Sequence, residues 1–313
     1  MNDAGADKVC DLTTAEKMGY PADARLLIIN ADDFGMCHDA NEATIVGLTQ
    51  GLLTSSSIMT PCPWFEEAAE FARNTSNADL GVHLTLNSEW KSYKWGPVLG
   101  SMEVPSLTDE RGYLWADVPS VFAHDRLDEV EVELEAQIEK AIAAGIDVTH
   151  LDCHMYPLHL RADYHHIYLK LALDFRLPMR INPRPMMRQL GMGEILNALD
   201  VNGIFYPDHF LHHGPRKLDE TEAYWTEVIR NLKPGISEIY CHPGLAREEL
   251  KACARDWRQR QRDFDYFTSE KARRLIKDEG IELIGYRKLR DAMSVVSKRS
   301  PSSSDSPSLK GRG

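Results

Sequence analysis

Two adjacent carboxylates and three histidines are the residues of this sequence whose types and positions point to chemistry. Asp32 and Asp33 end an apolar run, and His83, His154 and His242 each stand at or near the end of a later apolar stretch. One aspartate would be enough to cap a helix, and a single histidine is more often a satisfied polar residue than a ligand. Several such residues at comparable positions favour a functional site.

Two imidazoles and one carboxylate, with positions left open for water and substrate, form a familiar catalytic metal sphere. We expect the ligands to be Asp33, His83 and His154. The choice of His154 over His150 rests partly on alternation. In a strand, His150, Asp152 and His154 share one face, while Leu151 and Cys153 share the other.

The residues beside these ligands have predicted supporting places. Asp152 and His150 would stand behind the ligands, and Asp152 could accept an imidazole N–H or pair with Arg180. His159 could line the site. The pair His165-His166 is typical of a helix surface.

The adjacency of Asp32 and Asp33 constrains the backbone. On a regular strand their side chains would point to opposite faces. Both serve one site only where the strand gives way to a turn, which Phe34 and Gly35 make plausible because glycine tolerates sharp bends. With Asp33 on a metal, Asp32 is free to act as the base.

Apolar runs and helically spaced segments alternate about seven times after residue 24. The expected strands are 25–30, 55–60, 79–86, 149–154, 179–182, 204–207, 238–242 and 281–286. The expected helices are 38–51, 64–73, 125–145, 163–175, 186–199, 220–232 and 264–279. This α/β alternation favours a single irregular (β/α) barrel over a doubly wound open sheet. In both folds, functional groups gather at the carboxyl ends of the strands.

One catalytic domain with two flanking segments is predicted. Residues 1–24 would form an N-terminal extension, and residues 25–296 the barrel. The Ser/Pro/Lys-rich residues 297–313 have almost no apolar side chains and should be disordered. Prolines and glycines break any period across residues 87–124, which predicts a long loop insertion in the barrel.

Composition narrows the partners and the compartment. The 36 Lys+Arg against 48 Asp+Glu give a net charge of -12, which disfavours nucleic acid and anionic membranes. Neither a secretory signal in Met1 to Tyr20 nor a membrane-spanning apolar run is evident. Six cysteines without a C-x-x-C pair indicate free thiols in a reducing compartment, so we expect a cytoplasmic protein, with a homodimer left open.

Four motifs also resemble a known family in order and spacing. They are Asn30-Ala31-Asp32-Asp33-Phe34-Gly35, Gly81-Val82-His83-Leu84-Thr85-Leu86, Thr149-His150-Leu151-Asp152-Cys153-His154 and Cys241-His242-Pro243. The chain resembles the YdjC-like carbohydrate deacetylases over roughly residues 25–290. The resemblance implies an irregular (β/α) barrel of the polysaccharide-deacetylase type, one divalent metal ion (zinc or magnesium), and removal of acetyl from an N-acetylated sugar.

The resemblance also implies roles for individual residues. Asp33, His83 and His154 would be the metal ligands, Asp32 the base and His242 the acid. Arg180, in the run Met179-Arg180-Ile181-Asn182, matches a family arginine that could hold Asp32 in its ionised form.

The substrate side departs from the family pattern. Four residues, 155–158, intervene before His159, and the loop at 87–124 is longer than expected for a chitobiose enzyme. Trp90, Trp95 and Trp115 in this loop could stack on sugar rings or simply anchor the loop. The metal chemistry therefore transfers more safely than the identity of the sugar.

Two other functions stay open at this point. A metal-dependent phosphoesterase could use the same ligands, although it would want a second metal or basic clamps, for which Arg180, Arg184 and Arg188 are the available cluster. A non-catalytic sugar-binding protein would keep the tryptophans without needing Asp32 or His242.

Overall fold

The computed structural model describes residues 12–211 and 217–299, the last six of these without their side chains. Within this part of the chain, seven parallel strands form one sheet in the order β4-β3-β2-β1-β6-β5, with β7 also paired to β1. The strands are β1 (Arg25–Phe34), β2 (Ser55–Ile58), β3 (Leu80–Leu84), β4 (Val148–Cys153), β5 (His209–Phe210), β6 (Gly235–Cys241) and β7 (Glu282–Leu283).

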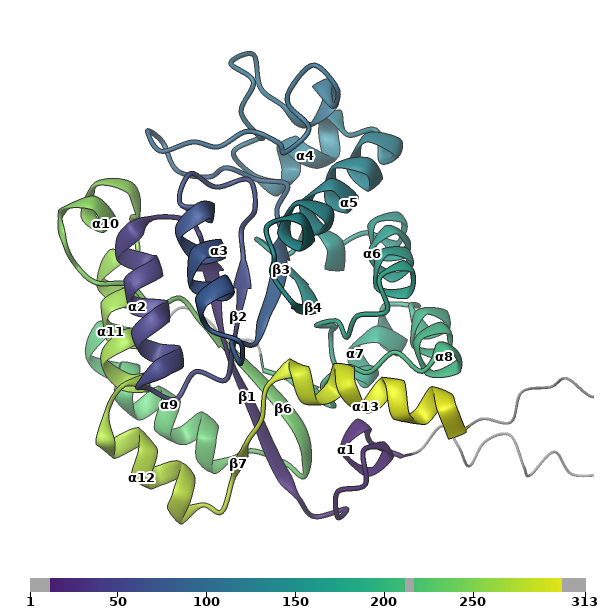
Figure 1. Cartoon of the computed structure of the whole chain (residues 1–313), viewed down its shortest axis with the longest axis vertical. Helices are drawn as coiled ribbons and strands as arrows, with labels where there is room; N and C mark the ends of the chain where they lie inside the picture. The colour runs from purple at the N-terminus through teal and green to yellow at the C-terminus, as the bar shows by residue number, and fades with distance from the viewer. Residues whose placement is uncertain (1–11, 212–216, 300–313) are drawn as a thin grey trace, which may run out of the picture.

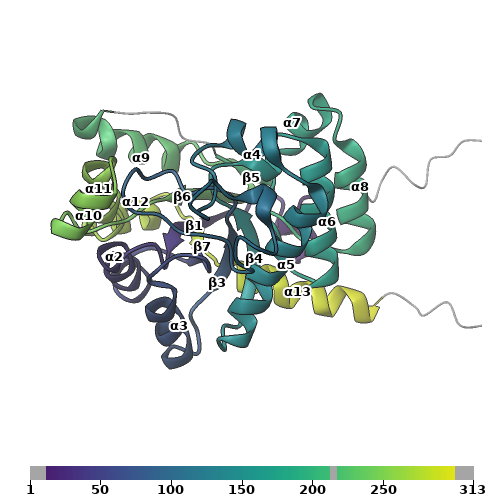
Figure 2. The same ribbon diagram turned by 90° about the horizontal axis from the view of Figure 1, so that it is seen from above.

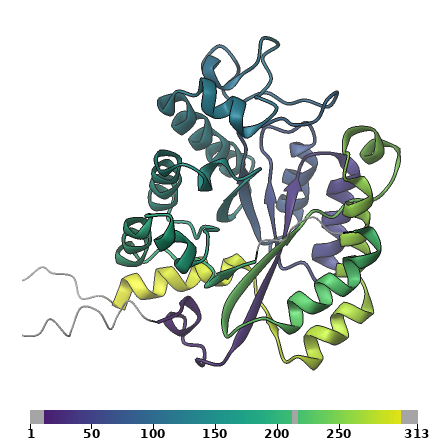
Figure 3. The same ribbon diagram turned by 180° about the vertical axis from the view of Figure 1, so that it is seen from behind.

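Helices surround this sheet, as the view from above shows (Figure 2). They are α1 (Thr14–Lys17), α2 (His38–Thr49), α3 (Phe65–Asn74), α4 (Val118–His124), α5 (Leu127–Ala143), α6 (Ala162–Asp174), α7 (Arg184–Gln189), α8 (Gly193–Asn202), α9 (Thr221–Arg230), α10 (Glu248–Cys253), α11 (Trp257–Phe267), α12 (Glu270–Asp278) and α13 (Tyr286–Arg299). Helices α2, α3 and α9–α12 lie on one side of the strands and α5–α8 on the other (Figures 1 and 3). None of the described helices is both long and apolar enough to cross a bilayer.

The parallel α/β architecture agrees with the sequence prediction, but the sheet is a partly open barrel. Its outer strands, β4 and β5, do not pair with each other in the described residues. Residues 179–182 and 204–207 were expected to be strands. Instead, Met179 makes a single bridge to Leu151, and its N–H donates to Phe205 O (3.3 Å). Pro178 and Pro183 flank this segment and have no N–H to donate to a ladder.

Several predicted helices also have different limits. The segment 186–199 forms two helices, α7 and α8, separated where Gly191 adopts φ 75°. The segment 264–279 is interrupted before Ser269, whose side chain accepts the Ala272 N–H and caps α12. Helix α13 begins where the last strand was expected to end and continues to residue 299, and the rest of the predicted tail lies outside the described residues.

The long segment after β3 is packed against the barrel. Glu133 of α5 is fully buried and accepts the N–H groups of Val98 (2.8 Å) and Leu99 (3.0 Å). Glu129, one turn earlier, accepts the Ser106 N–H (2.8 Å). The segment therefore forms a wall whose backbone is held by two carboxylates of one helix.

Substituting Glu133 tests this anchoring. Glu133→Ala leaves two backbone N–H groups without acceptors, so we expect a loss of about 1–3 kcal/mol in the free energy of unfolding. Amide hydrogen exchange over residues 95–107 should also accelerate. Glu139→Ala, on the exposed face of the same helix, is the control. Equal exchange in both variants would show that the carboxylate does not hold the segment.

Candidate metal centre

An unusual backbone conformation brings the adjacent aspartates to one side. The β1–β2 ladder slips between Ala31 and Phe34, and Asp33 adopts φ 71°. This left-handed conformation costs a non-glycine residue on the order of 1 kcal/mol, and it cancels the usual alternation of side chains. The predicted turn at Phe34 and Gly35 thus begins earlier, at Asp33, and Gly35 continues it with φ 93°.

The two carboxylates face a cavity of about 250 Å³ at the carboxyl ends of the strands. All six residues predicted as ligands or catalytic groups line it. They are Asp32, Asp33, His83, His154, Arg180 and His242. They come from the ends of β1, β4 and β6, from within β3, and from the segment that bridges to β4.

The three predicted ligands converge on one point. Asp33 Oδ1 lies 3.5 Å from His83 Nε2 and 3.2 Å from His154 Nδ1. Donors bound at about 2.0–2.1 Å around one tetrahedral ion would be about 3.3 Å apart. Asp33 Oδ1 is buried and accepts no hydrogen bond from the described residues. The donor set and its spacing therefore fit a divalent ion.

Each histidine has a carboxylate behind it. His83 Nδ1 lies 2.8 Å from Asp152 Oδ1, and His154 Nε2 lies 2.9 Å from Glu89 Oε2. A carboxylate that accepts one ring N–H leaves the other nitrogen free to bind a metal, so the two rings would use Nε2 and Nδ1, respectively.

The aspartate ligand is also held from one side. Arg260 of α11 donates from Nη2 to Asp33 Oδ2 (2.7 Å), while His242 Nε2 lies 4.0 Å from the same oxygen. This contact occupies Oδ2 and leaves Oδ1 directed at the two imidazoles.

A buried guanidinium binds the second aspartate. Arg180 donates from Nη1 and Nη2 to the two oxygens of Asp32, both at 2.8 Å. It also contacts Asp152 Oδ2 (3.1 Å) and donates from Nε to Glu238 Oε1 (2.8 Å). Asp32, His83 and Asp152 also lie close enough to hold an ion, but Arg180 already forms ion pairs with both of these carboxylates.

The charges in the centre shift the pKa values of its groups. Burial opposes ionisation of Asp33, but Arg260, His154 and His242 outweigh it and hold the pKa of this carboxyl well below its usual range. Burial likewise disfavours protonated His154, yet Glu89 and Asp33 raise its pKa to about 10. His83 follows the same pattern, because Asp152 and Asp32 raise its pKa in spite of burial.

Comparisons with known proteins show the family of this chain. A family model for YdjC-like proteins matches residues 26–278. The chain belongs to the YdjC-like family. Relatives named carbohydrate deacetylase include one from Thermus thermophilus, 31% identical over 86% of this chain and 95% of its own length. Another, from Enterococcus faecalis, is 30% identical over 84% of this chain and 97% of its own.

A solved structure also resembles this YdjC-like chain. It comes from Enterococcus faecalis and is described as a candidate cellobiose-phosphate cleavage protein. It is 29% identical, with a TM-score of 0.72, and the match covers 85% of this chain and 99% of the other.

Three of the four residues predicted to contact sugar do not line the cavity. Trp95 is buried beside His154 (ring centroids 6.2 Å apart) and donates its indole N–H to Asn87 O. Trp115 stacks on His124 and donates to Ser106 O. Both anchor the wall. His159 is buried outside the cavity wall.

The structure corrects the prediction for His165 and places His150 in the core. His165 was expected on a helix surface but is fully buried, 5.3 Å from the ring of His159, while His166 is exposed. His150 stacks on Tyr286 (3.9 Å) inside the barrel, and burial lowers its pKa to about 3. A Cβ on Gly81 would meet the His150 ring at 2.5 Å, so glycine is required there.

Sequence reasoning missed Glu89, Arg260 and Glu238. Glu89 lies in a segment without periodicity, and Arg260 is one of several arginines on a polar helix. Glu238 did carry a signal, because a carboxylate in a buried strand must have a partner. Its partners are Arg180 and Tyr286, whose hydroxyl donates to Oε2 (2.6 Å).

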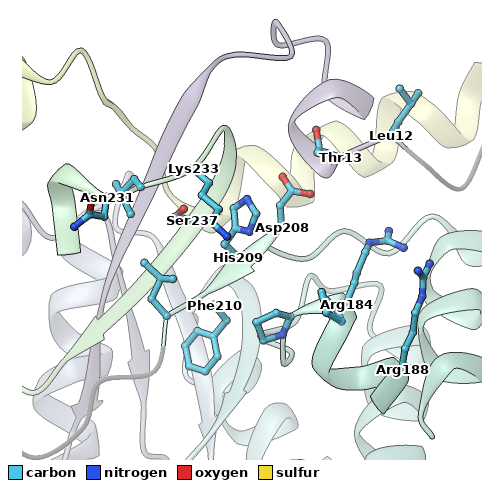
Figure 4. A pocket seen from close by; sticks show the side chains of 14 residues that line it. Leu12, Thr13, Arg184, Arg188, Asp208, His209, Phe210, Asn231, Lys233 and Ser237 are labelled. Atoms are coloured by element: carbon cyan, nitrogen blue, oxygen red, sulfur yellow. The ribbon is translucent and has the colours of Figure 1, made fainter. Parts of the chain in front are cut away.

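A larger cavity lies at the opposite ends of the strands, beside α1 and α7 (Figure 4). Its volume is about 490 Å³, and Arg184 and Asp208 line it. Arg184 is paired with Asp200, and Asp208 accepts N–H groups at the start of α1 and from Ile236. Arg184 and Asp208 are therefore both engaged by these partners, and this cavity is not the candidate metal centre.

The pKa of Glu238 gives a testable pH dependence. Burial raises it from 4.5 to about 7, so the folded chain binds this proton more tightly than the unfolded chain. Its contribution to stability is complete below about pH 4.5 and declines as the pH rises towards about 7, by about 3 kcal/mol. Glu238→Gln should lack this decline, so its free energy of unfolding, measured with urea, should improve relative to wild type from pH 4.5 to 8.

The control for this measurement is Glu110→Gln, at an exposed position. It should follow the wild-type pH dependence. Parallel curves for wild type and Glu238→Gln would mean that Glu238 ionises in the folded chain as easily as in the unfolded one.

Proposed function

We propose that this protein is a metal-dependent hydrolase that removes the acetyl group from an N-acetylated sugar, giving acetate and an amino sugar. The observation that carries the proposal is the convergence of His83 Nε2 and His154 Nδ1 on Asp33 Oδ1, which accepts no hydrogen bond from the described residues, with Asp32 in the same cavity. The relatives named carbohydrate deacetylase support the substrate class.

The metal would be held by Asp33, His83 and His154. When bound, a divalent ion supplies Lewis acidity to the acetyl carbonyl and lowers the pKa of water. Imidazole and carboxylate ligands suit zinc, and magnesium is the other candidate.

Asp32 is the proposed base. Its two hydrogen bonds from Arg180 fix the plane of the carboxylate beside the metal ligands. Asp32 would accept a proton from the water that attacks the acetyl carbon, and Arg180 would keep the carboxylate in place during the transfer.

His242 is the proposed acid. It follows β6 and lines the cavity, and its side chain is 27% exposed, so substrate can reach it. The C–N bond breaks productively only when the departing nitrogen receives a proton, and His242 would donate it.

Trp90 is the proposed sugar-contacting residue. Its ring lines the cavity, and its indole N–H is buried without a partner among the described residues. A sugar hydroxyl or the acetyl oxygen could accept this N–H while the ring covers an apolar sugar face.

The alternatives have less support. A phosphoesterase would need basic clamps, but Arg184 and Arg188 line the opposite cavity, and Arg180 and Arg260 are already paired with carboxylates. Glycoside cleavage needs a protonated carboxyl acid opposite a second carboxylate. Asp32, Asp33 and Glu89 are instead all paired with cationic groups or imidazoles.

The direct test is acetate release from a panel of N-acetylated mono- and oligosaccharides, with metal chelation and metal add-back. We expect at least one substrate to release acetate, activity to fall to background after chelation, and a divalent ion to restore it. Activity that survives complete removal of metal would refute the metal-dependent mechanism.

Two substitutions separate metal binding from proton donation. His83→Ala removes a ligand and should abolish stoichiometric metal binding together with activity. His242→Ala should retain metal, because His242 is not a proposed ligand, but lower kcat about 10²–10⁴-fold by removing the acid. Metal content by atomic spectroscopy and steady-state kinetics would distinguish them. Equal metal loss in both variants would contradict the assignment of His242.

The non-catalytic alternative has its own test. Asp32→Asn should retain sugar binding but lose acetate release. A parent protein that binds sugars, is inactive on every acetylated sugar, and is indistinguishable from Asp32→Asn would be a binding protein.

A further inference from the structure

The ring of His154 is held at both nitrogens. Nδ1 lies 3.2 Å from Asp33 Oδ1, and Nε2 lies 2.9 Å from Glu89 Oε2. A neutral imidazole carries one N–H. If Glu89 accepts that N–H from Nε2, the lone pair of Nδ1 points to the place where the ligands converge.

The carboxylates behind the two histidines differ in how they are held. Asp152, behind His83, belongs to β4 and is fixed by Arg180 (3.1 Å) and by Asn30 (3.3 Å). For the side chain of Glu89, His154 is the hydrogen-bond partner that the described part of the chain provides. Asp152 is thus in place regardless of the metal, whereas the position of Glu89 depends on its contact with His154.

Glu89 belongs to the wall formed by the segment after β3. The adjacent Ser88 donates its N–H to Trp115 O (2.8 Å), and its hydroxyl oxygen accepts the Trp95 N–H (3.1 Å). Tyr93 donates its hydroxyl to Met36 O (2.7 Å), just beyond the turn that carries Asp33. A change in the position of Glu89 would therefore disturb the neighbouring contacts made by Ser88 and Tyr93.

We propose that Glu89 is a positioning residue for His154 and couples metal binding to the order of residues 87–95. This inference rests on the proposed function, because it requires that the centre bind a metal. A metal that fixes His154 strengthens the contact with Glu89, and the contact with Glu89 must strengthen metal binding by the same factor, because such coupling is reciprocal.

The test compares Glu89→Ala and Glu89→Gln with wild type, using metal-stripped full-length protein and Co²⁺ as the probe. Titration is followed by the visible absorption of bound Co²⁺ and by calorimetry. We expect Glu89→Ala to lose about 10–100-fold in Co²⁺ affinity, as is typical when the partner of a ligand is removed. Glu89→Gln should lose less, because its amide oxygen can still accept the N–H.

Glu103→Ala is the matched control, since Glu103 lies exposed in the same segment. Its Co²⁺ affinity should stay within about twofold of wild type. A loss of affinity in Glu103→Ala as large as that in Glu89→Ala would overturn the proposal, because any disturbance of the segment would then have the same effect.

Hydrogen exchange supplies the second measurement. Co²⁺ should slow amide exchange across residues 87–95 in wild type and have much less effect in Glu89→Ala at saturating Co²⁺. A purely structural role predicts faster exchange in Glu89→Ala with and without Co²⁺, together with unchanged affinity, and would overturn the proposal. Wild type that fails to bind Co²⁺ would refute the proposed function itself, whereas tight binding by both proteins would refute only the coupling.

Discussion

One buried guanidinium contacts three of the carboxylates inside the barrel. Arg180 is 2% exposed and contacts the carboxylates of Asp32, Asp152 and Glu238. Burying a single unpaired carboxylate costs several kcal/mol, so three of them could not share this interior without a cation in contact with each. Arg180 therefore stabilises the point at which the strands that carry these side chains meet.

The same contacts connect the fold to the proposed chemistry. Arg180 orients Asp32, the proposed base, and contacts Asp152, which lies against His83 Nδ1 and would leave the other ring nitrogen of His83 free for a metal. The base and one ligand are therefore positioned by one residue. Arg260 positions Asp33 in a similar way. It donates to Oδ2 and leaves Oδ1 directed at His83 and His154. The remaining proposed ligand, His154, contacts Glu89, which lies outside the sheet.

The sequence predicts which side chains meet in the cavity, because strand exits in a parallel sheet share one edge, and this brings His83 and His154 close to Asp33. It does not predict Glu89 or Arg260. Their contacts span 65 and 227 residues, and local sequence patterns do not reveal partners so far apart in the chain. The left-handed backbone of Asp33 likewise arises from a slip in strand pairing, which residue types do not reveal. The sequence also does not predict that the segment after β3 packs against the barrel as a wall. Carboxylates of α5, a later helix, hold the backbone of this segment.

The most direct test of this account is the position of a bound ion. Crystals grown with Zn²⁺ or Co²⁺ and measured across the absorption edge of the metal locate it by anomalous scattering. The account predicts one ion within about 2.0–2.2 Å of Asp33 Oδ1, His83 Nε2 and His154 Nδ1. An ion bound instead between Asp32 and Asp152 with Arg180 displaced, or saturating metal that leaves the three predicted atoms without an ion, would contradict it.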